Sequence, residues 1–310
     1  MTGGLADRIE AELSQPAPDP VRAFAFSLAN PARDAAVLYY GSSLRTGDLS
    51  GVLDFYRLTR APHRRGLRGL VERVLWPEVS YHEAEIGGRR LRAKVATLTF
   101  HAFRRAAEGR TLDTTIWARF VQPVQRVWAA DPAAASAARD AVTAAVRTAS
   151  RYAAALGPRR GPPEAYWQAL FRRTYAAEFR METPDRADQL IAPAADRFAA
   201  VLPLAWREAG VVFEGIDGEL RVSRRPRVAW PLRRAAGKPL NLLRLAKAAF
   251  TFDGAARYAA WKIARHTGVE LEVTPFAERH PVLSAPAAWW RLRRAQAVAR
   301  RARLGSRPKS

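Results

Sequence analysis

A glycine–serine turn and a carboxylate a short distance further along the chain form a pair that could hold a nucleotide phosphate. Gly41, Ser42 and Ser43 follow an apolar run that ends at Tyr40, and Asp54 lies in the middle of the next apolar run. The backbone N–H groups and hydroxyl of such a turn can bind a phosphate. A carboxylate on the neighbouring strand can hold Mg²⁺ against that phosphate. The alternative is an ordinary strand–turn–strand unit with a solvated aspartate.

The elements that must position these groups are predicted from hydrophobic periodicity and turn residues. The first half of the chain has the pattern of a small mixed α/β unit. Its predicted elements are a helix over 21–29, strands over 36–41 and 52–59, a helix over 63–75, a hairpin of 79–86 and 90–100 around Gly87 and Gly88, a helix over 100–108, and an extended piece over 115–127.

The second half is predicted to be helical up to a second hairpin. An alanine-rich stretch, 131–156, favours a helix, and the glycine- and proline-rich stretch 157–163 breaks it. The pattern then predicts helices over about 164–180 and 185–209, and a hairpin over 211–222 that turns at Asp217 and Gly218.

Composition excludes several classes of protein. The 310 residues include no cysteine, so disulfides and thiolate metal sites are excluded. A hydrophobic content of 48% is normal for one large or two small globular domains. No run approaches the roughly 18 apolar residues of a membrane-spanning helix, and the N-terminus lacks an apolar signal core. We therefore expect a cytoplasmic protein.

The net charge of +22 is concentrated towards the C-terminal end. Residues 221–310 hold 21 Lys and Arg against only Asp253, Glu270, Glu272 and Glu278, which gives +17 and leaves +5 for the first 220 residues. Such asymmetry indicates an anionic partner, either a nucleic acid or an anionic membrane surface. The alternative is a solvated basic tail.

The basic tail also has an amphipathic pattern. Over 240–250, aliphatic residues and Phe250 occupy one side of a predicted helix, and Arg244 and Lys247 lie near the other. Basic amphipathic helices with aromatic residues at the edge suit the plane of an anionic membrane. The same composition suits single-stranded nucleic acid. A helix packed on the core with a charged outer face is the third interpretation.

Several segments, taken in order, resemble the mitochondrial translocator assembly and maintenance protein family, the matrix-side phosphatidate cytidylyltransferases, and the chain resembles a bacterial member. They are Tyr40-Gly41-Ser42, Leu53-Asp54-Phe55, Leu91 to Val95, Arg119 with Gln122-Pro123-Val124, Tyr175 to Met181, and the hairpin 211–223, spread over about 190 residues. The resemblance implies an α+β fold. Its parts are a nucleotidyltransferase-fold mixed-sheet domain over 1–128, a helical domain with a terminal hairpin over 129–225, and a basic amphipathic membrane-contacting tail over 226–310.

The resemblance also implies an activity and a site. Members of the family transfer CMP from CTP to phosphatidic acid, with Mg²⁺, and release CDP-diacylglycerol and pyrophosphate. The expected catalytic residues are Asp54, which would also be the metal ligand, and Lys94. The expected nucleotide-binding residues are Tyr40, Gly41, Ser42, Ser43, Arg119, Tyr175, Glu178 and Arg180.

Each of the charged groups has a simpler interpretation. Lys94 would neutralise phosphate charge, or be a solvated strand lysine. Arg119 would grip a phosphate with its planar fork, or form a surface ion pair. Tyr175 and Glu178 share a helix face and would close the site, or form a polar cluster on a helix surface.

Two positions depart from the expected pattern. Tyr56 stands where the nucleotidyltransferase superfamily has a second acid, and Gln122 stands where a basic residue is expected. A single carboxylate is a thin Mg²⁺ site. A second ligand would have to come from Glu83, Glu85 or Glu178.

Three functions follow from these observations. The first is a phosphatidate cytidylyltransferase, peripheral on the inner face of the cell membrane, with its basic tail on the anionic lipid surface. The second is a nucleotidyltransferase acting on nucleic acid; nucleic acid is not the expected partner, because no RNA- or DNA-binding module is recognisable. The third is a non-catalytic membrane-associated assembly factor on the same fold, which the missing second acid favours.

Overall fold

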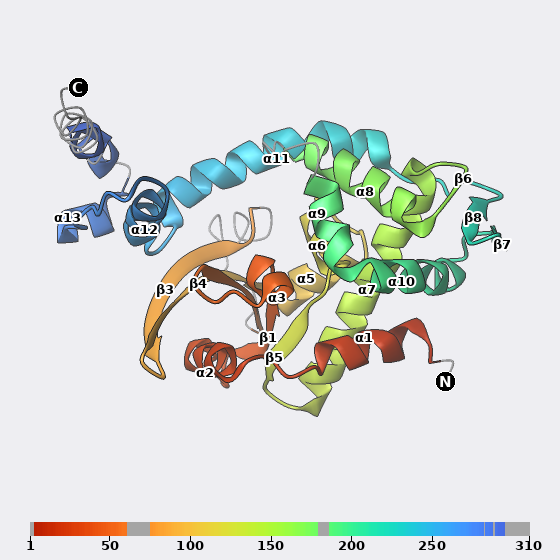
Figure 1. The fold of residues 1–310 in the computed structure, drawn as a ribbon, viewed down its shortest axis with the longest axis horizontal. Helices are drawn as coiled ribbons and strands as arrows, with labels where there is room; N and C mark the ends of the chain where they lie inside the picture. Colours follow the sequence, from red (N-terminus) through yellow and green to blue (C-terminus); the bar gives the residue numbers. More distant parts are fainter. Residues whose placement is uncertain (1–2, 61–74, 179–185, 282, 288, 295–310) are drawn as a thin grey trace, which may run out of the picture.

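The computed structural model describes residues 3–60, 75–178, 186–281, 283–287 and 289–294. It is an α+β fold built around a mixed five-stranded sheet, which confirms the coarse fold class (Figure 1). The strand order is β3-β4-β2-β1-β5, and β2 and β4 run parallel while the other neighbours are antiparallel. The strands are β1 (Asp34–Tyr40), β2 (Val52–Thr59), β3 (Glu78–Ile86), β4 (Arg89–Thr99) and β5 (Gln125–Ala129).

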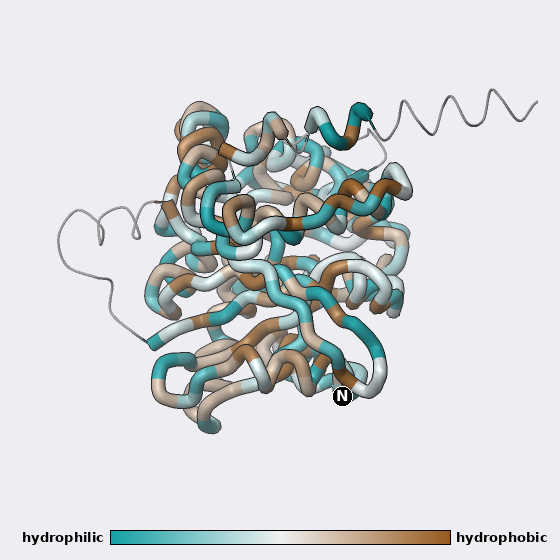
Figure 2. The backbone as a smooth tube through the Cα atoms, turned by 90° about the vertical axis from the view of Figure 1, so that its left-hand side faces the viewer, coloured by the Kyte–Doolittle hydropathy of each residue, from teal (hydrophilic) through white to brown (hydrophobic). Residues whose placement is uncertain are grey.

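The strands alternate, so that each face of the sheet has its own apolar layer. Val37, Tyr39 and Phe55 point to one face, which packs on helix α2 (Asp19–Leu28) through Phe24. The opposite face carries the alternate residues, including Leu38, and joins the main core under the helices. Hydrophobic and hydrophilic residues accordingly alternate along the backbone in the body of the molecule (Figure 2).

Helices cover the main-core face of the sheet (Figure 1). They are α1 (Leu5–Leu13), α5 (Phe100–Ala107), α6 (Thr115–Phe120) and the long α7 (Pro132–Leu156). The predicted extended piece over 115–127 is wrong in its first half, because 115–120 is helical. There Ile116, Trp117 and Phe120 are buried, and the Trp117 ring stacks on Tyr152 of α7 with centroids 4.8 Å apart.

The following helices continue the same core. They are α8 (Pro163–Ala177), α9 (Arg186–Ile191), a 3₁₀ turn (Ala192–Ala194) and α10 (Ala195–Glu208). The predicted single helix over 185–209 is therefore interrupted at this turn, which contains Pro193. The second hairpin, β7 (Phe213–Ile216) and β8 (Glu219–Val222), pairs in addition with the short strand β6 (Arg160–Gly161). The predicted helix over 63–75 lies almost wholly outside the described residues.

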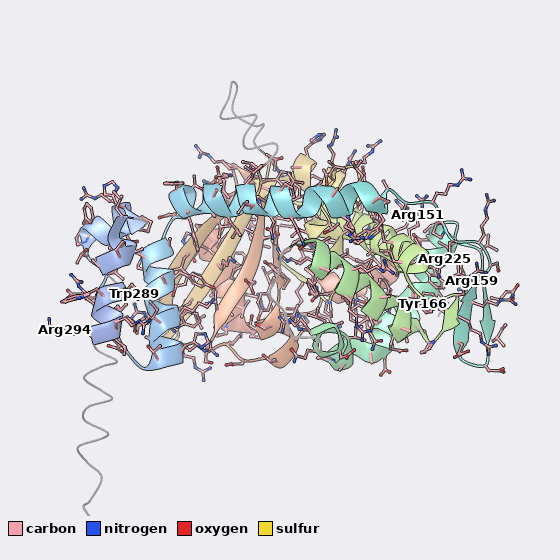
Figure 3. All side chains as sticks on the ribbon, turned by 90° about the horizontal axis from the view of Figure 1, so that it is seen from above. Arg151, Arg159, Tyr166, Arg225, Trp289 and Arg294 are labelled. Carbon is pink, nitrogen blue, oxygen red and sulfur yellow. The ribbon has the colours of Figure 1, made fainter. Side chains whose placement is uncertain are left out.

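The last described helices form an arm across the molecule. Helix α11 (Trp230–Thr251) runs from α8 to the strand β3, and α12 (Ala255–Thr267) and α13 (Pro275–Arg279) follow at its far end (Figure 1). Seen from above, Trp289 and Arg294 lie at this end of the molecule, and Arg159 and Arg225 lie at the opposite end (Figure 3). Within the described ranges, no helix combines the length and the apolar character needed to cross a membrane.

Candidate functional site

Four side chains lie next to each other across the sheet and are called the polar row here. Strand register places Tyr40 opposite Asp54, Asp54 opposite Lys94, and Lys94 opposite Tyr81. Register partners on neighbouring strands share a face, and this is the main-core face, where the next row towards the helices is apolar. The parallel pairing of β2 with β4 therefore brings the two predicted catalytic residues, Asp54 and Lys94, side by side.

The glycine of the turn lies directly against the carboxylate of the polar row. Gly41 has φ +98°, and a Cβ atom at this position would lie 2.6 Å from Oδ2 of Asp54. Only glycine permits both this backbone conformation and this approach. Ser42 is exposed and begins the short helix α3 (Ser42–Thr46), whereas Ser43 is buried beside the Tyr39 phenol. Of the two predicted serines, Ser42 is thus the one exposed to a ligand.

The carboxylate lies among cations. Burial raises the pKa of Asp54, and the neighbouring charges of Lys94, Arg119 and Arg45 act in the opposite direction. Arg45, on α3, donates to Gln122 Oε1 at 3.3 Å, and it interacts electrostatically with Arg186 and Asp54. Three positive groups around one carboxylate form a site suited to a polyanion.

Arg119 is held by aromatic groups rather than by a surface ion pair. Its Nη1 donates to the Tyr56 hydroxyl at 2.6 Å, and its guanidinium carbon lies 5.3 Å from the Tyr40 ring centroid and 5.7 Å from that of Tyr56. Burial by itself would lower the pKa of Arg119, but Tyr56, Tyr40, Glu178 and Asp54 together raise it above its ordinary value. The residue in the place of the missing second acid, Tyr56, therefore positions a cation.

Residues at the C-terminal end of α8 lie beside the charged side chains around Asp54. Buried Glu178 accepts hydrogen bonds from the hydroxyls of Thr114 and Thr115, the latter at 3.3 Å. Tyr175 stacks on Phe171 with centroids 6.2 Å apart and lies within the electrostatic reach of Arg45. The structure thus brings Tyr175 and Glu178 to the site, while Arg180 lies outside the described residues.

The protein side chains at this site do not complete the coordination shell of a magnesium ion, so a bound triphosphate would have to provide further ligands. Among the described residues, no group of three or more His, Asp or Glu side chains is placed to hold a metal. Glu83 is engaged by Arg90 at 2.5 Å and Arg92 at 3.4 Å, and Glu178 is engaged by the threonines. Mg²⁺ commonly takes one or two carboxylates and completes its shell with water and substrate phosphates. Asp54 with triphosphate oxygens matches that pattern.

Helix α11 turns its polar side inwards, towards the site. Asn241 donates to the backbone oxygen of Glu178, Arg244 pairs with the buried Asp113, and Lys247 Nζ donates to the backbone oxygen of Leu75 at 2.9 Å. The outward side carries the exposed apolar residues Leu232, Leu242, Leu243, Leu245 and Phe250, and Arg234 and Lys238 are exposed in the N-terminal half of the helix. The predicted separation of the two sides over 240–250 is confirmed, but Arg244 and Lys247 bind the protein body.

Sequence reasoning did not identify two contributors to the site. Arg45 was visible as a basic residue in the connection between the strands, but nothing in the pattern directed it towards Asp54. Tyr258 of α12 lies against the Tyr81 ring at 5.5 Å, and both burial and the charge of Asp54 raise its pKa. Its position depends on a contact between segments far apart in sequence.

A hollow of about 1100 Å³ lies elsewhere in the described part of the molecule. It opens at the far ends of β2 and β4, between Thr59, Thr99 and the start of α7, and no residue of the polar row lines it. We place the candidate site at the polar row, where opposite charges and a backbone feature specific to glycine coincide. No protein-family model and no curated protein matches this chain.

Proposed function

We propose that this protein is a phosphatidate cytidylyltransferase with a nucleotidyltransferase fold. The observation that carries the proposal is the contact of Gly41 with Asp54, with Arg45, Lys94 and Arg119 gathered around that carboxylate. A turn, a carboxylate and several cations are what a metal-bound triphosphate requires. The resemblance to the translocator assembly and maintenance family supplies the choice of CTP and of phosphatidic acid.

The proposed reaction is a phosphoryl-type transfer of CMP. An oxygen of the phosphatidate phosphate attacks the α-phosphorus of CTP and forms the new P–O bond. The bond from that phosphorus to the oxygen bridging the β-phosphate breaks, and pyrophosphate leaves with the electron pair. Because phosphatidate is an anion at neutral pH, no general base is needed. Positioning and charge neutralisation carry the catalysis.

Each residue has a role in that scheme. The backbone at Gly41 and the Ser42 hydroxyl cradle the triphosphate, and Arg45 and Arg119 neutralise its charge. Lys94 lies beside Asp54 and stabilises charge that develops at the reacting phosphate. When bound, Mg²⁺ would be held by Asp54 and phosphate oxygens, and it supplies further neutralisation of phosphate charge.

Helix α11 supplies the proposed contact with the lipid surface. Its outward residues Leu242, Leu243 and Phe250 are 68%, 53% and 80% exposed, an arrangement that water disfavours and a bilayer interface favours. Exposed Trp289 and Trp290, each beside an arginine of the next turn, extend the same kind of surface. The basic residues that follow them would add attraction to anionic lipid.

Conversion of labelled CTP into a chloroform-soluble product, with phosphatidate vesicles and Mg²⁺, tests the proposal. Wild type should form the product and Asp54→Asn should not. The variant should still fold, since burial disfavours the charge that it removes. Asp140→Asn, at an exposed carboxylate on α7, is the control and should keep full activity.

Absence of product with the wild-type protein, in a sample that still sediments with the vesicles, would contradict the enzymatic proposal. It would favour the non-catalytic assembly factor instead. Salt-dependent binding to RNA that is tighter than binding to vesicles would favour the nucleic-acid alternative.

A further inference from the structure

Helix α12 is anchored on the edge of the sheet next to the polar row. The Tyr81 N–H donates to the backbone oxygen of Asp253 at 2.8 Å, and the Tyr81 and Tyr258 rings are 5.5 Å apart. Gly254 begins the helix with φ +77°, and a Cβ atom there would lie 2.8 Å from the Tyr81 backbone oxygen. The start of α12 is therefore fitted closely to β3 and is not a loose tail.

The next turns of α12 carry an indole with two guanidinium groups near its ring. Trp261 has the guanidinium carbon of Arg92 at 5.7 Å from its ring centroid and that of Arg265 at 5.4 Å. Tyr258 stacks beside it, with centroids 6.2 Å apart. We call Arg92, Tyr258, Trp261 and Arg265 the α12 cluster. Cation–π contacts of this kind keep cationic groups in place without neutralising them.

The α12 cluster lies one row away from Asp54. Arg92 is two residues before Lys94 on β4, hence on the same face, and pairs in register with Val52. Arg265 reaches the start of β2, where its Nη1 lies 3.2 Å from the position of a Cβ atom on Gly51. Arg92 lies 3.4 Å from Glu83, which also pairs with Arg90, and the charge of Arg265 acts on the exposed Asp48.

The geometry of in-line transfer indicates which reactant lies on the β4 side of Asp54. The attacking oxygen and the leaving pyrophosphate lie on opposite sides of the α-phosphorus. The groups assigned to the triphosphate, at Gly41, Arg45 and Arg119, come from the turn after β1, from α3 and from α6. The attacking group must therefore approach from the β4 side, past Lys94, where the α12 cluster stands.

We propose that the α12 cluster binds the phosphomonoester headgroup of the lipid acceptor, an inference that rests on the proposed function. Arginine presents a planar fork that matches phosphate oxygens in pairs. Two such groups beside Lys94 suit a dianionic monoester better than the single charge of a phosphodiester. The same arm that carries the apolar face of α11 would then also deliver the headgroup to the reacting centre.

Binding without turnover tests this inference separately from the activity. The full chain, without CTP, is titrated calorimetrically with water-soluble dihexanoyl phosphatidate. Wild type should bind it, and Arg265→Gln should weaken that binding about tenfold or more. Lys262→Gln, at an exposed lysine on the same helix, is the matched control and should bind like wild type. Dihexanoyl phosphatidylglycerol, a phosphodiester, should bind at least tenfold more weakly than phosphatidate.

Three results would overturn the inference. Equal phosphatidate binding by wild type and Arg265→Gln would remove the cluster from the acceptor site. Inorganic phosphate that binds as tightly as phosphatidate would indicate a site for free phosphate. Weakened CTP binding in Arg265→Gln, with phosphatidate binding unchanged, would assign the cluster to the nucleotide. If phosphatidate binds as expected but no labelled product forms, the inference stands and the proposed catalysis fails.

Discussion

Replacement of Gly41 by alanine measures how closely the turn must approach Asp54. The new Cβ atom would lie 2.6 Å from Oδ2 and 3.2 Å from Cβ of Asp54. Ordinary contact begins near 3.4 Å, so the carboxylate and the turn must separate by about 0.8 Å. A displacement of about 1 Å can slow a positioned reaction about 100-fold. We therefore expect Gly41→Ala to lose about 100-fold in CTP turnover.

Gly47→Ala is the control for positive φ, since it places a Cβ atom at a left-handed position without the contact. Gly47 has φ +70°, and nothing lies within 4 Å of a Cβ atom placed there. Alanine in such positive-φ conformations destabilises a protein by roughly 1–3 kcal/mol. Both variants should therefore melt at lower temperatures than wild type, and Gly41→Ala by the larger amount, because φ +98° with ψ −160° is a conformation almost confined to glycine. Only Gly41→Ala should lose its turnover.

The assay follows labelled CTP into chloroform-soluble lipid, at a temperature where circular dichroism shows both variants folded. Turnover is compared per folded molecule, so that the loss of stability in each variant does not enter the comparison. Equal turnover in Gly41→Ala and Gly47→Ala would refute the argument, because the contact with Asp54 would then have no bearing on the reaction.

Three further predictions concern the arm and the core. Substituting both Leu242 and Leu243 by serine removes about 1 kcal/mol of interfacial burial per residue, so vesicle binding in a sedimentation assay should weaken about 30-fold while the melting temperature stays unchanged. Arg244→Met leaves its buried carboxylate partner unpaired, which should lower the free energy of unfolding in urea by about 3 kcal/mol; an unchanged midpoint would contradict this. Arg126 donates to both carboxylate oxygens of Glu10 at 2.7 and 3.1 Å and lowers the pKa of Glu10 below 4.5. That stabilisation is present above pH 4.5 and is lost as the pH falls through the folded-state pKa. The melting temperatures of wild type and Glu10→Gln should therefore differ most near pH 7 and converge in acid, and a constant difference would count against the pairing.

Local signals in the sequence predicted the elements that carry the site. Apolar runs separated by Gly41 and by Gly87-Gly88 gave β1 to β4 nearly to the residue, because strand alternation and turn chemistry act over a few residues. Helix α6 was not predicted from these local signals. Its Thr115, Ile116 and Trp117 favour strands by propensity, and burial against α7 outweighs that preference.

Contacts between segments far apart in the sequence could not be predicted from local signals. The hairpin of β3 and β4 follows from its turn, but the parallel pairing that sets Lys94 beside Asp54 joins segments about 40 residues apart. No periodicity encodes that pairing. The same holds for Arg45 and Tyr258, whose proximity to Asp54 depends on how α3 and α12 dock.

Helix α11 shows why a pattern can separate two faces without telling which one is buried. In water the apolar face of a helix normally packs inwards. Here the partners of the inward face are buried polar groups, Asp113 and the backbone oxygen of Glu178, so arginine and asparagine are drawn in and leucine is left outside. Gly237 permits this docking, because a Cβ atom there would lie 2.5 Å from the Ala177 backbone oxygen.

The reversed orientation of α11 also constrains the proposed function. A flexible basic tail would hold the protein near a bilayer without fixing its orientation. In this structure the outward apolar face belongs to a helix whose inward face touches the carbonyl of Glu178, and residues 252–254 alone separate that helix from α12. A bilayer bound at α11 would thus stand in a fixed relation to Trp261 and Asp54. The headgroup would then need to move only between two neighbouring parts of the same arm, and the interface would take part in positioning the substrate as well as in attracting the protein.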